Sequence, residues 1–105
     1  MTEAFFCVTE SNILTVKLPR DVDHHVAKAL RYTIDDKLLR IRPQKLILDL
    51  TETQFMDSSG LGLILGRART TKEMEIDYLL VNPNLPTQKL LKMSGVDKLI
   101  SIQSL

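Results

Sequence analysis

The sequence predicts an α/β fold built around one mixed β-sheet. Short segments rich in β-branched, aromatic and aliphatic residues alternate with longer segments in which apolar residues recur at helical spacing, a pattern typical of strands connected by helices. Proline, asparagine and aspartate residues separate many of these segments. The 105 residues match the usual length of one domain. Residues 1–105 are therefore expected to form a single domain with right-handed crossover connections.

A β-hairpin is expected at the start of the chain. Residues 5–9 and 12–18 are rich in β-branched and aromatic side chains, and the polar residues 10–12 suit a turn between them. The single cysteine, Cys7, lies in an apolar run. We expect a buried, inert thiol there, as suits a reducing compartment.

A long helix is predicted after Pro19. Its apolar residues recur at nearly helical spacing, at Val26, Leu30, Ile34, Leu38 and Ile41. Asp21 or Asp23 could cap its start, and Pro43 marks its end. Residues 46–50 then form an apolar run that is too short for a helix and has no polar alternation. This run predicts a central strand covered on both faces.

A second helix is predicted from Ser58 onward. Its apolar side is expected to consist of Leu61, Ile64, Leu65 and Ala68. Gly62 and Gly66 lie one turn apart and are expected to allow close backbone packing.

The last third of the chain predicts a strand, a short helix and a final strand. Residues 77–81 are apolar enough for another short strand, and residues 82–84, Asn-Pro-Asn, are expected to end it. Pro86 suits the first turn of a helix that continues through Leu90, Leu91 and Met93. Residues 99–102 predict the last strand.

The composition argues against several classes of protein. Fourteen Lys and Arg residues oppose thirteen Asp and Glu residues, which leaves a formal charge of +1 and no general field to attract nucleic acid. No apolar run approaches the roughly 20 residues needed to span a bilayer, and the N-terminus lacks the basic and apolar regions of a signal peptide. We therefore expect a cytoplasmic protein with no nucleic-acid or membrane partner.

The most informative segment is residues 55–62, Phe-Met-Asp-Ser-Ser-Gly-Leu-Gly. It places an acid, two hydroxyl groups and a glycine where the second helix begins. Asp57 or Ser58 could cap the free backbone N–H groups of that helix, and Gly60 would let another backbone segment approach closely. Taken alone, Ser58 could be no more than a helix cap.

Residues 56–62 resemble the signature of the STAS-domain anti-sigma-factor antagonists, in particular those of the sporulation sigma F system. The likeness continues, in the family's order, through residues 22–25, 64–67 and 93–96. The resemblance implies a STAS-like single domain with a mixed central sheet of about four to five strands and three to four helices packed mainly on one side.

The resemblance also implies a non-enzymatic regulator of transcription, in sporulation or a stress response. In this family the first serine after the aspartate is phosphorylated, which here is Ser58. The partners would be an anti-sigma factor that is itself a serine kinase and a phosphatase that resets the serine. No cofactor is expected, because ATP and Mg²⁺ belong to the kinase.

The partner-binding surface is expected around the same serine. By the resemblance, Asp57 supports the phosphorylation site and Asp23 lies beside the same surface. Ser59, Gly60 and Leu61 belong to this expected surface, with Ser59 as a cap or neighbour rather than the phosphate acceptor. The partner-binding set also includes Leu63, which we expect to be an exposed docking contact because the helix is apolar on more than one side.

A charge switch at this position is physically sound. Phosphorylation adds about −2 charge, which a helix N-terminus tolerates. The fold should survive, while a partner would have to dock over the phosphate and the adjacent Asp57. If that costs roughly 3 kcal/mol, affinity falls by about two orders of magnitude.

The sequence departs from the family pattern at two places. The family usually has a glycine and a glutamate before the first helix and often a Gly-Gly turn after the second. Residues 19–22 and 74–77 lack these glycines. The second loss removes the usual residue with positive φ from a helix end, so the turn near Glu75 should be strained, reshaped or capped by another residue. The first loss, near Arg20, bears on which partner is recognised.

Three other functions remain open. The chain could be a STAS adaptor in a transport or stress-signalling complex, with no phosphorylation. A serine hydrolase is less favoured because residues 56–60 do not fit Gly-x-Ser-x-Gly and the only histidines, His24 and His25, have no clear orienting partner. We expect those histidines to be surface or capping residues rather than metal ligands. Nucleotide binding has little support because no Gly-rich phosphate loop is present.

Overall fold

In the computed structural model, residues 5–9 and 11–105 are described, and they contain a five-stranded mixed sheet. The sheet order is β1-β2-β4-β6-β7, in which only β1 runs antiparallel to its neighbour. The strands are β1 (Phe5–Val8), β2 (Ile13–Lys17), β4 (Lys45–Asp49), β6 (Asp77–Val81) and β7 (Ser101–Gln103). The predicted hairpin, central strand and mixed sheet are confirmed, apart from Glu10 of the turn, which lies outside the described residues.

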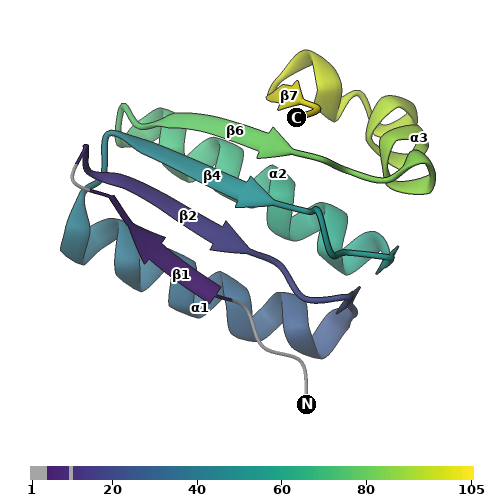
Figure 1. Ribbon diagram of the computed structural model, residues 1–105, viewed down its shortest axis with the longest axis horizontal. Coiled ribbons are helices and arrows are strands. Elements are labelled where there is room, and N and C mark those ends of the chain that lie inside the picture. Colours follow the sequence, from purple (N-terminus) through teal and green to yellow (C-terminus); the bar gives the residue numbers. More distant parts are fainter. Residues whose placement is uncertain (1–4, 10) are drawn as a thin grey trace.

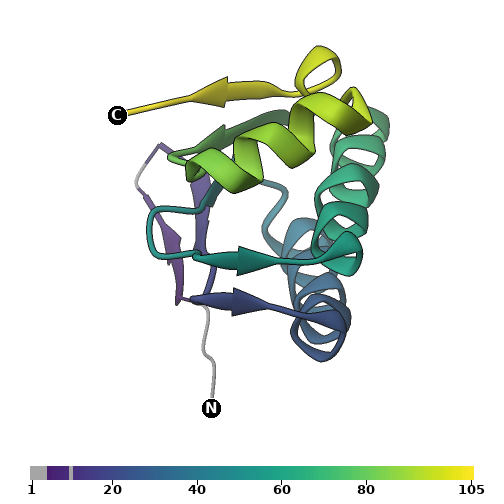
Figure 2. The ribbon, with the colours of Figure 1, turned by 90° about the vertical axis from the view of Figure 1, so that its right-hand side faces the viewer.

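Two long helices cover one face of the sheet (Figures 1 and 2). They are α1 (His24–Ile41) and α2 (Ser58–Glu73), which pack side by side. A shorter helix, α3 (Leu85–Ser94), and a 3₁₀ turn, η1 (Val96–Lys98), lead into β7. The fold therefore matches the predicted α/β class, with the main helices on one side. None of the helices in the described ranges has the length and apolar composition needed to cross a membrane.

The core lies between the sheet and these helices. Leu14, Val16, Leu46 and Leu48 alternate along β2 and β4 and are fully buried. Their neighbours, such as Ile47, are only partly buried. The prediction that residues 46–50 are covered on both faces was therefore wrong, because both long helices pack on the same face of the sheet.

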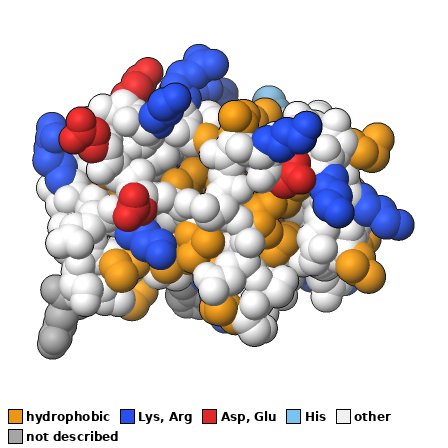
Figure 3. Space-filling view, turned by 90° about the horizontal axis from the view of Figure 1, so that it is seen from above, with side chains coloured by type: hydrophobic (Ala, Val, Ile, Leu, Met, Phe, Trp, Pro, Cys, Tyr) orange, Lys and Arg blue, Asp and Glu red, His pale blue; other side chains and the backbone are white. Residues whose placement is uncertain are grey.

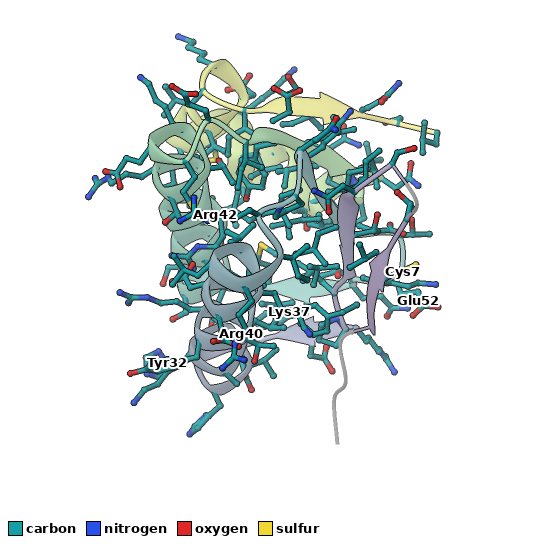
Figure 4. All side chains as sticks on the ribbon, turned by 90° about the vertical axis from the view of Figure 1, so that its left-hand side faces the viewer. Cys7, Tyr32, Lys37, Arg40, Arg42 and Glu52 are labelled. Atoms are coloured by element: carbon teal, nitrogen blue, oxygen red, sulfur yellow. The ribbon has the colours of Figure 1, made fainter. Side chains whose placement is uncertain are left out.

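Cys7 also corrects an expectation, because its thiol is exposed. Side chains alternate along a strand, and Phe6 points toward the core and packs against it. Cys7 consequently lies on the opposite face of β1, as Figure 4 shows. The apolar run of residues 4–8 concealed this alternation.

The buried face of α2 differs from the predicted apolar side. Leu63 and Ile64 are buried, whereas Leu65 is exposed. Gly60, Arg67 and Thr71 take the remaining buried positions, so the face is completed by residues that a hydrophobic pattern does not reveal. Gly62 and Gly66 do not pack closely, because a Cβ atom on either would find no atom within 4 Å.

The C-terminal helix presents an exposed mixed surface. Asn84 caps α3 by accepting a hydrogen bond from the N–H of Thr87, and Leu91 is buried beneath the helix. Leu85 and Met93 are exposed. Figure 3 shows hydrophobic side chains interspersed with basic ones on the face seen from above.

The turn after α2 resolves the question raised by its missing glycine. Glu75 has a φ of 59°, in the left-handed region that glycine usually occupies. The N–H groups of Met74 and Glu75 donate to carbonyl groups in the last turn of α2, and the N–H of Ile76 donates to Thr71 O. Glu75 thus keeps the geometry of the glycine turn, although the left-handed backbone conformation costs a non-glycine residue free energy.

Candidate functional site

Two helix starts are brought together by a small parallel pair of strands, β3 (Asp21–Val22) and β5 (Phe55–Met56). In this pair Val22 lies opposite Met56. Figure 2 shows both strands running toward the starts of α1 and α2. The residue that follows each strand is an aspartate that caps a helix, so Asp23 and Asp57 occupy equivalent positions.

The loops before this strand pair are joined by hydrogen bonds. The N–H groups of Gln54 and Phe55 both donate to the carbonyl oxygen of Arg20, at 2.8 and 3.0 Å. Arg20 Nε also donates to Gln54 Oε1 at 3.2 Å. These contacts fix the β3 segment against the β5 segment although more than thirty residues separate them.

Asp57 is the N-cap of α2. Its Oδ1 accepts hydrogen bonds from the N–H groups of Ser59 and Gly60, at 2.8 and 3.2 Å. Ser58 is the first residue of the helix and its side chain is exposed. Because the aspartate does the capping, the Ser58 hydroxyl is not needed for it and faces solvent.

Asp23 is the N-cap of α1, and its Oδ1 accepts from the N–H of Val26 at 2.9 Å. The following residue, His24, reaches across to α2, where its Nδ1 lies 3.2 Å from Ser59 Oγ. His24 and His25 are both exposed, and their rings pack edge to face. The surface around Ser58 therefore includes residues from both helix starts.

Gly60 holds α2 against the strand pair. A Cβ atom at this position would lie 2.3 Å from Met56 Cγ and 3.2 Å from Val22 Cγ1. Met56 and Val22 are themselves buried. A close approach at Gly60 is present, but the expectation that another backbone would make it was wrong, because the neighbours are two side chains.

The remaining residues of the expected partner-binding surface are more buried. Leu61 is partly buried and packs against the core. Leu63 is only 4% exposed, so the expectation that it is an exposed docking contact was wrong. It fails because Leu63 faces the core from the same side of α2 as Gly60 and Arg67.

The sequence reasoning missed the contact between His24 and Ser59, and it missed the strand pair that creates it. One signal was available: residues 22–25 and 56–59 both read as an apolar residue, an aspartate and two polar residues. The repeated pattern marks two capped helix starts of the same design. In the described residues, no group of three or more His, Cys, Asp or Glu side chains is arranged to hold a metal ion.

Comparisons with known proteins agree with this geometry. The family model for the STAS domain matches residues 7–104. The chain belongs to the STAS-domain family. It is 37% identical over 90 residues to an anti-sigma F factor antagonist of Paenibacillus polymyxa, covering 86% of this chain and 77% of the relative. It is 32% identical over 89 residues to one from Lysinibacillus sphaericus, covering 85% and 75%.

The fold is also similar to that of a solved relative. The structure of the Bacillus cell fate determinant SpoIIAA in its phosphorylated form superposes with a TM-score of 0.78 at 25% identity, covering 95% of this chain and 90% of that one. The resemblance seen in residues 56–62 is therefore confirmed. The names of these relatives support the assignment of this chain to the anti-sigma-factor antagonists.

Proposed function

We propose that this protein is an anti-sigma-factor antagonist controlled by phosphorylation of Ser58. The unphosphorylated form binds an anti-sigma factor that is also a serine kinase, and the sigma factor is released. Phosphorylation of Ser58 ends the binding, and a serine phosphatase restores it. The protein supplies a substrate hydroxyl and a docking surface and performs no catalysis itself.

The observation that carries this proposal is the division of roles between Asp57 and Ser58. Asp57 caps α2, while the Ser58 side chain is exposed at the first helical position. A kinase could reach this hydroxyl without unfolding the helix. A phosphate of about −2 charge there would lie at the positive end of the helix and beside the Asp57 carboxylate.

The same geometry disfavours a serine hydrolase. The histidine contact goes to Ser59 and not to the exposed Ser58. Among the described residues, no carboxylate is hydrogen-bonded to His24 to orient it as a general base. The relatives are likewise antagonists, so the binding role has the stronger support.

The proposal is tested by mixing the protein with candidate anti-sigma kinases and ATP, then locating any phosphate by mass spectrometry. We expect one phosphate, on Ser58. Ser58→Ala should bind the kinase and resist modification. Ser58→Asp should remain folded by circular dichroism and bind more weakly, by up to about 100-fold.

Ser59→Ala and Ser59→Asp are matched controls one residue away. Ser59 is partly buried and contacts His24, so phosphate should not appear on it. Equal binding by Ser58→Ala and Ser58→Asp would favour the alternative of an adaptor without phosphorylation. Phosphate found only on Ser59 would contradict the assignment of the acceptor.

A further inference from the structure

A groove runs between α1 and α2 and begins beside the phosphorylation site. It has a volume of about 640 Å³. His24 and Ser59 line one end, next to Ser58, and the groove extends along both helices to Arg31 and Thr70. The surface around Ser58 therefore continues directly into this groove.

The groove is strongly basic. Lys28 and Arg31 line it from α1, and Arg67 and Arg69 line it from α2. None of the lining residues in the described ranges is acidic. Because the whole chain carries a formal charge of only +1, these cations form a local concentration of positive charge. We call this surface the basic groove.

Arg67 is the buried member of the basic groove, with 4% of its surface exposed. Its Nε lies 3.0 Å from Asp35 Oδ1, so the guanidinium forms an ion pair within the protein. Burial lowers the pKa of Arg67, although Asp35 opposes this shift. Arg67 therefore lies in the wall of the groove, and the exposed cations Lys28, Arg31 and Arg69 are the ones that a bound anionic segment could contact.

The shape of the groove suits an extended chain. Gly62 and Gly66 leave bare backbone on the α2 wall, since a Cβ atom on either would find open space. From Ser59 to Thr70 the helix advances by roughly 16 Å. That length equals about five residues of extended peptide.

We propose that the basic groove binds an acidic, Asp- or Glu-bearing segment of the anti-sigma factor, an inference that rests on the proposed function. The bound segment would pass Ser59 at the mouth of the groove. Phosphate on Ser58 would then place about −2 charge where the acidic segment enters. Repulsion between the two would contribute to release of the partner.

The first test needs no natural partner. The probe is an eight-residue peptide of alternating Glu and Gly, and its control is the same peptide with Gln in place of Glu. We expect the Glu peptide to shift the amide NMR signals of Gly62 and Gly66 at low salt, and the Gln peptide to leave them unchanged. Absence of shifts, or the same shifts from inorganic phosphate alone, would overturn the proposal of a peptide groove.

The second test uses the anti-sigma kinase that phosphorylates Ser58. The double variant Lys28→Glu/Arg31→Glu should bind it at least about tenfold more weakly at low salt, and the difference should shrink at high salt. Lys89→Glu/Lys92→Glu on the exposed side of α3 makes the same charge change and should have little effect. Equal weakening by both pairs would refute a specific role for the groove.

The two proposals fail in different ways. If the groove variants bind normally while Ser58→Asp still weakens binding, the groove inference is wrong and the phosphorylation switch stands. If the Glu peptide occupies the groove but no anti-sigma kinase binds the wild-type protein, the proposed function is wrong and the groove retains its preference for acidic chains.

Discussion

Replacing Gly60 by alanine should destabilise the protein, whereas the same change at two other glycines of α2 should not. The added Cβ atom at Gly60 would lie 2.3 Å from Met56 Cγ, while ordinary contacts begin at 3.4 Å. Met56 would therefore have to move by about 1 Å within a packed site that also contains Val22. The Cγ atom is close to the backbone, so rotation of the outer part of the side chain cannot relieve the contact.

The expected size follows from two opposing effects. Overpacking costs about 1–3 kcal/mol, and the better helix propensity of alanine returns up to about 1 kcal/mol. Gly60→Ala should thus lower the free energy of unfolding by about 1–2 kcal/mol, or roughly 5–15 °C in melting temperature. Gly62→Ala and Gly66→Ala have open space and should raise stability by up to about 1 kcal/mol.

Urea denaturation followed by circular dichroism measures these differences. In a Met56→Ala background the clashing atoms are absent, so adding Gly60→Ala should cost less than it does in the wild-type protein. If Gly60→Ala proved as stable as Gly62→Ala, or if Met56→Ala gave no relief, the packing account of this helix start would be refuted.

Two further changes test the end of α2 and the strand beneath it. Glu75→Gly should stabilise the protein by about 0.5–1 kcal/mol in urea titrations because φ is 59° there, whereas Glu73→Gly, at the last residue of α2, should destabilise it by up to a similar amount. Tyr78 Oη donates to Ile64 O, and burial raises the pKa of Tyr78 above its ordinary 10.0. Unfolding releases the phenol proton above pH 10.0, so stability should fall with rising pH there. Tyr78→Phe should lose about 1 kcal/mol at neutral pH but decline less steeply above pH 10.0; equal slopes would contradict this.

Elements with a long periodic pattern, or with clear signals at both ends, could be predicted from the sequence. The helical spacing from Val26 to Ile41, ended by Pro43, indicates α1, and Asp23 proves to be its cap. Residues 77–81 are predicted and observed as a strand with the same bounds. In these segments the local pattern and the tertiary packing favour the same structure.

The elements that were missed depend on packing between distant segments. β3 and β5 have two residues each, which is too short for any periodicity to be visible. The buried face of α2 includes Gly60, Arg67 and Thr71, whose identities do not indicate burial. Similarly, Glu75 gives no sign in sequence that its backbone is left-handed.

The same distinction between local sequence and distant packing applies to the candidate site. Asp57 and Ser58 are neighbours in the chain, so their relation to the helix start is visible in the sequence. The contact between His24 and Ser59 requires the register of β3 against β5, which no local pattern specifies. The sequence could therefore indicate the serine at the helix start but not the contacts around it.

The capping arrangement bears on where a phosphate on Ser58 would act. The N–H groups of Ser59 and Gly60 are the donors that a helix start would otherwise offer to an anion, and Asp57 already occupies both. A phosphate on Ser58 would therefore gain little from the helix backbone and would remain directed to solvent. On the proposed function, its charge then acts on an approaching partner rather than on the fold, so Ser58→Asp should lose affinity while its unfolding free energy changes by less than about 0.5 kcal/mol.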